Sequence, residues 1–587
     1  MVTFSEPVEA ATAGNPANYA LSHGVRVQGV VLMEDPAIVA LRTSPMTPGP
    51  IYVLTVNNVR DRAQNPNTIP PNSQQSFTVG YTPLEPWVVR GTNEPPGPSS
   101  RRTALAITEI MYHPTNRPDG RNLEFIELYN SGLWAEDLSG YRLSGDVDYT
   151  FPPGTTLPAR GYLVVAANPA DVQAVYGLTG VLGPLTNANA DPTNVLPNGG
   201  GRIRLRDELG TVLLEVNYDD ADPWPVAADG GGHSLVLARP SYGEDDPWAW
   251  SASDRVGGSP GQRDLPSGHP WATIVINEIL AHTDAPWVDF VELFNYGSSV
   301  VDLSGCILTD DPATNKFRIP ANTTIPPMGW VSFTELQMGF ALSAAGETVY
   351  LIAPDGSRVI DVVRFDAQQN GVAYGRYPDG APRLRRLTEP TAGQANARPL
   401  VSPVVINELY YHPVSENDDE EFVELWNWGT EAVDLGGWRL RGGISFNFPQ
   451  GTFLPAGGLV VVARNRAQSL ALHTNLNPAL VLGNYSGRLS NQRDTVRLQM
   501  PDDLVSTNQF GVIITNKIYI TVDEVRYRDG GRWGRWADGG GSSMANSRRG
   551  LEAGLAGLKA AERIATMLGL HDTKKIRGRL VLRLLLP

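Results

Sequence analysis

Short runs of alternating apolar and polar residues, separated by turns rich in glycine and proline, occupy most of the chain. Residues 347–365, ETVYLIAPDGSRVIDVVRF, show the pattern clearly, because two such runs flank a Pro-Asp-Gly turn. Alternation with a period of two is typical of β-strands with one buried face, and the turn sequence favours a hairpin. The pattern therefore predicts an all-β protein.

One sequence phrase recurs three times: EFIELYNSGLWAEDLSGYRL (124–143), DFVELFNYGSSVVDLSGCIL (289–308) and EFVELWNWGTEAVDLGGWRL (421–440). A related segment precedes each phrase, ITEIMYHP, INEILAHT or INELYYHP, and an aromatic residue with an Asp-Gly turn follows each one. In every copy the glutamate of F-[IV]-E-L and the aspartate of D-L-x-G are ten residues apart. This fixed spacing predicts one hairpin geometry used in each copy, and short strands spaced in this way predict tandem β-sandwiches.

The repeats and the Pro/Gly/Ser-rich stretches between them predict the domain boundaries. The predicted segments are a smaller β-domain at 1–85 without the repeated phrase, a linker at 86–102, copy 1 at 103–262, a linker at 263–270, copy 2 at 271–400, copy 3 at 401–549 and a basic, helix-like tail at 550–587. Two interpretations stay open for the tail. It is either a frameshifted, foreign sequence or a genuine amphipathic helix.

The repeated phrase resembles the lamin-tail domain, and the residues that carry the resemblance in copy 2 are Asn277, Glu278, Phe290, Glu292, Leu293, Asn295, Asp302, Leu303 and Gly305. The resemblance implies an immunoglobulin-like β-sandwich in each copy. Because the chain has no coiled-coil heptads, it is similar to the bacterial secreted proteins that carry several such domains rather than to a nuclear lamin. The resemblance thus implies an extracellular or cell-surface location.

Residues 1–85 resemble a bacterial immunoglobulin-like module of surface-layer and adhesion proteins through the phrases FSEPV and TVNNVRDRAQN. In that family further strand residues precede FSEPV, so we expect the chain to begin inside a domain. The opening MVTFSEPVEAA has neither the basic start nor the apolar centre of a secretory signal peptide. The apolar runs are far shorter than the ~20 residues that cross a bilayer, so we expect no transmembrane segment.

The formal net charge of −15 argues against a nucleic-acid partner, because phosphate binding requires clustered Lys and Arg. Residues 550–587 carry seven basic and three acidic residues, so the acidic charge belongs to the body of the chain. The single cysteine, Cys306, excludes an internal disulfide. It lies in an alternating apolar run, which predicts a buried and inert thiol.

A glutamate lies between aromatic residues in each repeated strand, as in Phe290-Glu292-Phe294. Because side chains alternate along a strand, Val291 and Leu293 should face the core and Glu292 the outer face. A partly desolvated carboxylate there needs hydrogen bonds or a cation. A second glutamate on a potential neighbouring strand completes a pair in each copy, and the candidate calcium ligands are Glu109, Glu127, Glu278, Glu292, Glu408 and Glu424. The alternative is hydrogen bonding to backbone amides or to an arginine.

Arg142 and Arg439 stand where an arginine could reach the glutamates of copies 1 and 3, but copy 2 has Ile307 at that position.

Each copy also contains E-x-x-x-H, as in Glu109 and His113. On an extended strand four residues span about 13 Å, which is too far for two ligands of one zinc ion. We therefore expect these histidines to stabilise turns.

The patterns around the remaining acidic residues indicate structural roles rather than catalytic or metal-binding roles. Asp137, Asp302 and Asp434 precede the turn of D-L-x-G, where aspartate commonly accepts backbone amides. The run ENDDEE (416–421) predicts a solvated loop. No catalytic motif occurs in a context that would support it, and no cofactor other than calcium is implied.

These observations predict a non-catalytic interaction or scaffold region of a bacterial secreted or cell-surface protein, with an unidentified protein or polysaccharide partner. One alternative is a set of accessory domains of an extracellular hydrolase or nuclease whose catalytic domain lies outside these residues. A weaker alternative is a carbohydrate-binding sandwich that uses tryptophans such as Trp134, Trp287 and Trp428.

Overall fold

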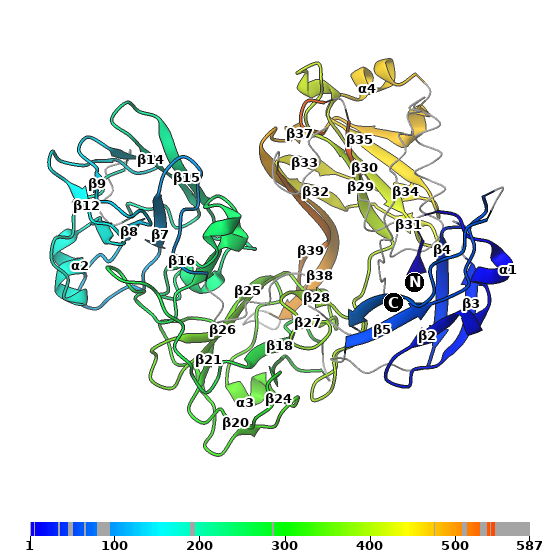
Figure 1. The fold of residues 1–587 in the computed structure, drawn as a ribbon, viewed down its shortest axis with the longest axis horizontal. Helices are drawn as coiled ribbons and strands as arrows, with labels where there is room; N and C mark the ends of the chain where they lie inside the picture. Colours follow the sequence, from blue (N-terminus) through cyan, green and yellow to red (C-terminus); the bar gives the residue numbers. More distant parts are fainter. Residues whose placement is uncertain are drawn as a thin grey trace. The chain divides into compact units, whose positions relative to one another are not determined.

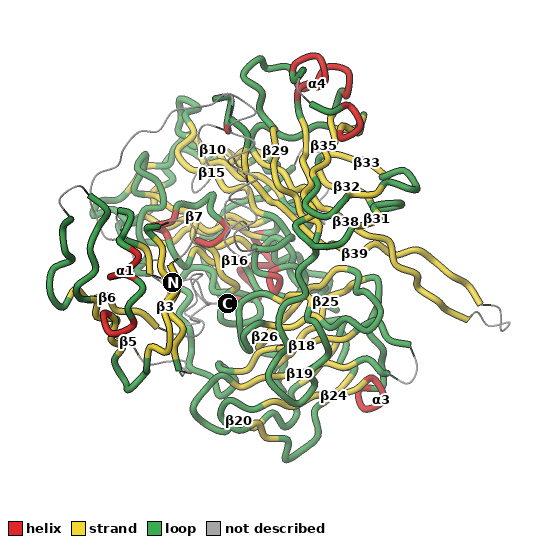
Figure 2. Tube along the Cα trace, turned by 90° about the vertical axis from the view of Figure 1, so that its right-hand side faces the viewer, coloured by secondary structure: helices red, strands yellow, loops and turns green. Residues whose placement is uncertain are grey.

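The computed structural model describes the chain at residues 2–4, 6–32, 36–44, 51–63, 66–78, 94–187, 194–284, 287–474, 476–507, 513–528, 537–540 and 542–545. The described residues among 1–84, 401–501 and 519–587 form one compact unit, and those among 85–400 and 502–518 form a second. The predicted tail at 550–587 lies outside the described residues. Strands and loops dominate both units, and helices are short (Figures 1 and 2).

Copy 1 contains two antiparallel sheets (Figure 1). The first has the order β13 (Tyr162–Ala166), β8 (Phe125–Asn130), β7 (Leu105–Met111), β16 (Leu235–Leu237) and β17 (Trp250–Ala252). The second has the order β11 (Tyr149–Thr150), β10 (Arg142–Gly145), β14 (Gly201–Arg206) and β15 (Val212–Tyr218). A short ladder joins β9 (Glu136–Asp137) to β12 (Thr156–Leu157), and helix α2 (Pro169–Tyr176) follows β13.

Copy 2 repeats this arrangement strand for strand. Its first sheet has the order β24 (Trp330–Thr334), β19 (Phe290–Asn295), β18 (Ile274–Leu280), β27 (Tyr374–Arg376) and β28 (Leu384–Arg386). Its second has the order β22 (Phe317–Arg318), β21 (Ile307–Thr309), β25 (Gly346–Ile352) and β26 (Val359–Asp366). The short ladder is β20 (Val301–Asp302) with β23 (Thr324–Ile325), and helix α3 (Glu335–Met338) follows β24.

Copy 3 has the same two layers, but each of its sheets differs from those of copies 1 and 2 in the strands at its edges. Its first sheet has the order β36 (Val481–Gly483), β35 (Leu459–Ala463), β30 (Phe422–Asn427), β29 (Val404–Tyr410) and β40 (Met544–Ala545), with β35 and β36 parallel. Its second has the order β37 (Ser486–Gly487), β33 (Ile444–Asn447), β32 (Arg439–Gly442), β38 (Arg493–Thr507) and β39 (Ile513–Arg528). The short ladder is β31 (Val433–Asp434) with β34 (Phe453–Leu454), and helix α4 (Arg466–Leu472) follows β35.

The N-terminal segment forms two three-stranded sheets. One has the order β1 (Val2–Thr3), β4 (Ile38–Thr43) and β3 (Val27–Leu32), and the other has the order β2 (Tyr19–Leu21), β5 (Ile51–Val56) and β6 (Ser73–Thr78). Helix α1 (Ala10–Ala13) lies between β1 and β2 in the chain. Val39 and Leu54, one from each sheet, lie in the same buried cluster, so apolar side chains of the two sheets form a common core.

The alternation in the repeated strands places one face of each in the core between the two sheets. In copy 2, Val291 and Leu293 of β19 are fully buried and belong to the same cluster as Leu308 and Leu351 of the second sheet. Each such side chain contributes about 1.5–3 kcal/mol when it leaves water. The predictions of an all-β sandwich and of a buried Cys306, which lies in this cluster, are confirmed.

Copies 1 and 2 share direct contacts within the second unit. The guanidinium of Arg358 donates to both oxygens of Asp254, at 3.0 and 3.3 Å. The backbone N–H of Val359 donates to Nε2 of His233 at 2.9 Å. Because Arg358 and His233 are 5% and 2% exposed, this contact excludes water and stabilises the junction. Among the described residues, no helix combines the length and apolar character needed to span a bilayer.

Candidate functional site

A β-bulge occurs at the same position in all three copies. In copy 1, Ile107 pairs with Leu128 and Glu109 pairs with Glu127, so Thr108 has no partner in the register. The corresponding unpaired residues in copies 2 and 3 are Asn277 and Asn407. An extra residue in one strand reverses the alternation of its side chains beyond the bulge. Ile107 therefore faces the core while Glu109 lies on the opposite face, beside Glu127.

The bulge brings the six candidate glutamates together as three cross-strand pairs. The pairs are Glu109 with Glu127, Glu278 with Glu292 and Glu408 with Glu424. The expectation that the two strands of each pair are neighbours is thus confirmed.

The unpaired bulge residue then binds one oxygen of the second glutamate. Thr108 Oγ1 donates to Glu127 Oε1 at 2.7 Å, Asn277 Nδ2 to Glu292 Oε1 at 3.1 Å and Asn407 Nδ2 to Glu424 Oε1 at 2.8 Å.

In copy 2 a segment that follows β28 closes over the glutamate pair. We call residues 391–394, TAGQ, the clasp of copy 2. The backbone N–H and the hydroxyl of Thr391 donate to the two oxygens of Glu278, at 2.9 and 2.8 Å. The N–H of Gly393 donates to Glu292 Oε2 at 2.6 Å. Both carboxylates are therefore held by protein donors, as buried charged groups require.

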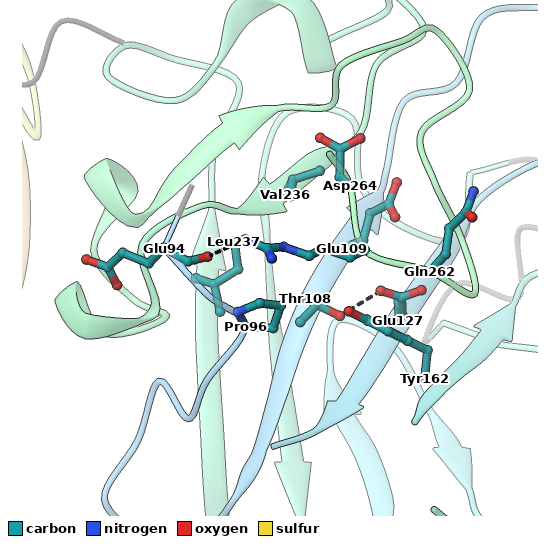
Figure 3. A pocket seen from close by; sticks show the side chains of 11 residues that line it. Glu94, Pro96, Thr108, Glu109, Glu127, Tyr162, Val236, Leu237, Gln262 and Asp264 are labelled. Carbon is teal, nitrogen blue, oxygen red and sulfur yellow. Dashed lines mark hydrogen bonds between the residues drawn. The ribbon is translucent and has the colours of Figure 1, made fainter. Parts of the chain in front are cut away.

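Residues 259–262 of copy 1, SPGQ, bind the glutamate pair in the same way. We call them the clasp of copy 1. The N–H and hydroxyl of Ser259 donate to Glu109 at 2.8 and 3.2 Å, and the N–H of Gly261 donates to Glu127 Oε2 at 2.6 Å. Ser234 Oγ adds a further bond to Glu109 at 2.5 Å. Figure 3 shows the two glutamates projecting from adjacent strands toward the chain that carries Gln262.

Copy 3 retains the pair with fewer donors. Glu424 accepts from Asn407, and Glu408 accepts from the hydroxyl of Ser543. Ser543 directly precedes β40, the strand that pairs with β29 as β16 and β27 pair with β7 and β18. In the part of copy 3 that the structure describes, no segment corresponds to the two clasps.

Burial raises the pKa of these carboxyl groups, and the hydrogen bonds of the clasp partly offset the effect. The pKa of Glu278 is raised to about 7 and that of Glu292 to about 8. Burial also raises the pKa of Glu424 to about 7. In copy 1 burial raises the pKa of both glutamates, and Glu109 raises that of Glu127 further through charge repulsion. Each pair thus carries protons more readily than an exposed pair would.

The contacts of the glutamates fit the hydrogen-bonding alternative better than the calcium alternative. Calcium requires six to eight oxygen ligands, whereas the partners of the pairs in copies 1 and 2 include backbone N–H groups, which repel a cation. Among the described residues, no group of three His, Cys, Asp or Glu side chains is arranged to hold a metal ion. Arg142 binds Asp148 and Arg439 binds Gln499, which agrees with the expectation from Ile307 that this position supplies no shared arginine partner.

The face that carries the glutamates is covered by protein rather than by solvent. Glu292 has no exposed surface, and Phe290 and Phe294 are 6% and 1% exposed. Phe290 packs with Leu387, and the Phe294 ring stacks on Trp330 at 5.5 Å between centroids. Glu292 thus lies on the face opposite the core, as expected, but it is fully rather than partly desolvated, because the chain that follows β27 folds back over this sheet.

A cavity of about 30 Å³ lies beside the pair of copy 1, lined among others by Thr108, Glu109, Glu127, Tyr162 and Asp264 (Figure 3). Its size is that of one or two water molecules, whereas small-molecule sites usually measure about 300–1,000 Å³. A second cavity, between strands of the N-terminal segment, measures about 10 Å³. The arrangement at Glu109 and Glu127 is thus suited to holding a chain segment rather than a small-molecule substrate.

The turn predictions agree with the structure. The carboxylates of Asp137, Asp302 and Asp434 accept the N–H two residues later, at 2.8–2.9 Å. His113 and His412 bind the aspartates of the Asp-Gly turns, Asp229 and Asp538, at 2.6 Å. Burial raises the pKa of the Cys306 thiol to about 12, which agrees with an inert side chain.

A third buried acid in each copy was not predicted. Glu124, Asp289 and Glu421 directly precede F-[IV]-E-L and are 2%, 5% and 0% exposed. Glu421 accepts from Tyr485 and from the N–H of Leu489, at 2.8 and 2.9 Å. The prediction of a solvated loop for ENDDEE is therefore wrong at its last residue. The recurrence of an acid before the same phenylalanine is the signal that could have identified this position.

A comparison with protein families matches the family described as Lamin Tail Domain to residues 98–220, 268–366 and 398–513, more than half of the chain. The three matched ranges contain the three repeated phrases. The clasps at 259–262 and 391–394 lie outside them. No curated protein matches the chain.

Proposed function

Because the chain belongs to the lamin tail domain family and carries three copies of the domain in tandem, we propose that it is a non-catalytic interaction or scaffold region of a bacterial secreted or cell-surface protein. The observation that carries this proposal is the use of the repeated charged residues. The paired glutamates, the acids before the repeated phenylalanine and the turn aspartates all form hydrogen bonds within the fold. We therefore expect the binding site to lie on exposed loops. Loops on a rigid sandwich are common binding sites.

Two exposed tryptophans favour the loops of copies 1 and 2 as binding sites. Trp134 is 84% exposed and Trp287 is 64% exposed. Trp428 differs, because its Nε1 donates to the carbonyl of Ser402 at 2.8 Å, and this contact explains the residue as a structural anchor. An exposed indole is a frequent contact residue for proteins and for sugar rings. Among the tryptophans that the structure describes, the carbohydrate-binding alternative therefore rests on Trp134 and Trp287.

Binding panels test the proposal. The full chain is applied to bacterial and host surface proteins, to polysaccharides and to DNA, next to the variants Trp134→Ala and Trp287→Ala. We expect binding to a protein or polysaccharide that one of these variants weakens, and no binding to DNA. Retention of DNA alone would contradict the proposal. A catalytic domain encoded beside this region would favour accessory domains of a hydrolase or nuclease instead.

A further inference from the structure

The sequence after β40 sets copy 3 apart from the other two copies. In copies 1 and 2 the chain leaves the equivalent strands, β16 and β27, forms one more strand and then reaches its clasp. Both clasps contain Ser/Thr-X-Gly, in which the first residue binds one glutamate and the glycine binds the other. Residues 546–587 contain no Ser/Thr-X-Gly sequence. Among the residues that the structure describes, the receiving pair of copy 3 therefore has no clasp.

The receiving pair of copy 3 has the same geometry as the other two. Glu408 and Glu424 are register partners across a bulge, and Asn407 binds Glu424 Oε1. The other oxygen, Oε2, is the one that accepts the N–H of Gly261 or Gly393 in copies 1 and 2. Glu424 is 8% exposed. A buried carboxylate with an oxygen in this position is suited to receive a backbone donor.

We propose that the glutamate pair of copy 3 binds, in trans, a Ser/Thr-X-Gly segment of a partner protein in the turn conformation that both clasps adopt. The partner would donate a hydroxyl and an N–H to Glu408 and a glycine N–H to Glu424, as the clasps do within copies 1 and 2. It would also continue the sheet beside β40, the position of β17 and β28. Addition of a strand to a sheet edge is an established mode of peptide recognition, and bonds to carboxylates give it specificity. This inference rests on the proposed interaction function and names the partner class for one copy.

A peptide of copy 1 provides the probe. Residues 250–264, WSASDRVGGSPGQRD, contain β17 and the clasp and carry two acidic and two basic residues, so nonspecific attraction to the acidic chain is small. Binding of the labelled peptide to the full chain is followed by fluorescence anisotropy. We expect one site per chain, weakened about tenfold or more by Glu424→Gln, which removes a charged acceptor. The matched control Glu431→Gln changes an exposed acid of the same copy and should leave binding unchanged.

Peptide variants keep the test independent of protein folding. Ser259→Ala removes the clasp hydroxyl and should weaken binding to the unaltered chain, whereas Ser251→Ala makes the same change outside the clasp and should not. The proposal is overturned if the peptide does not bind, if Glu424→Gln leaves the affinity unchanged, or if both serine variants bind alike. These outcomes are separate from the binding panels, whose readout depends on Trp134 and Trp287.

Discussion

Replacement of Thr391 by valine tests whether the glutamate pair holds the clasp of copy 2. The change removes one hydroxyl and preserves the size of the side chain, so it leaves no cavity. The lost hydroxyl lies 2.8 Å from a carboxylate oxygen of Glu278, which has no exposed surface, and 3.2 Å from Asn396 Oδ1. A bond to a charged group contributes about 1.5–3 kcal/mol and one to a neutral group about 0.5–1.5 kcal/mol. Burial raises the pKa of Glu278 to about 7, so both forms are present at pH 7 and we expect a loss of about 1–2 kcal/mol.

Hydrogen exchange of the full chain, followed by mass spectrometry, measures this loss locally. The N–H groups of Thr391 and Gly393 are bonded to the glutamates, so they exchange only when the clasp opens. A loss of about 1–2 kcal/mol corresponds to about 5–30-fold faster exchange in Thr391→Val, since 1.4 kcal/mol is a factor of about ten. The effect should be larger at pH 9 than at pH 5, after correction for intrinsic rates, because Glu278 is charged above its pKa.

Thr391→Ser is the matched control, because serine keeps the hydroxyl. It should exchange like the unaltered chain to within about a factor of two. Equal protection in the valine and serine variants at both pH values would refute the reasoning, since it would mean that the hydroxyl bond to Glu278 does not stabilise the clasp.

Four further results are expected. Arg358→Ala removes the buried guanidinium that binds Asp254 across the junction of copies 1 and 2 and should destabilise that junction by about 3–5 kcal/mol, measured as faster limited proteolysis there than in Arg358→Lys. Burial raises the pKa of Glu292 to about 8 and that of Glu421 to about 7. The folded chain thus holds protons that the unfolded chain has lost, and its calorimetric unfolding temperature should fall as the pH rises from about 5 to about 8, less steeply in Glu292→Gln; a rise would contradict the assignment. The unfolding midpoint should be the same in chelator and in millimolar calcium, because a ligand of the folded state would raise it. Cys306 should react with a thiol reagent only after denaturation, and rapid reaction of the folded chain would contradict its burial.

Much of the fold follows from local patterns in the sequence. Val291 and Leu293 alternate with polar or aromatic neighbours, and this alternation alone assigns them to the core. Asp302 binds the N–H two residues later, a contact so local that the sequence D-L-x-G is enough to predict it. The repeat itself predicted three equivalent domains, which the family match supports. These features depend on residues that are neighbours in the chain, where steric and hydrogen-bonding preferences act directly.

The environment of Glu292 could not be predicted from local sequence patterns. Alternation predicted an outer face, but the donor from Gly393 comes from a residue 101 positions away. Glu421 likewise is buried by Tyr485, 64 positions away. No periodic pattern in the sequence predicts either contact, since each depends on where a later segment crosses the sheet.

The sequence alone determined the strands, the turns and the number of repeats, because all of these follow from short-range periodicity and spacing. The tertiary structure decided what the glutamates do. The bulge at Thr108, Asn277 or Asn407 reverses the alternation and turns both carboxylates to one face. In copies 1 and 2 a distant clasp then covers them with N–H and hydroxyl donors. Burial and hydrogen bonding depend on tertiary contacts, so the structural role of these carboxylates could not be read from the sequence.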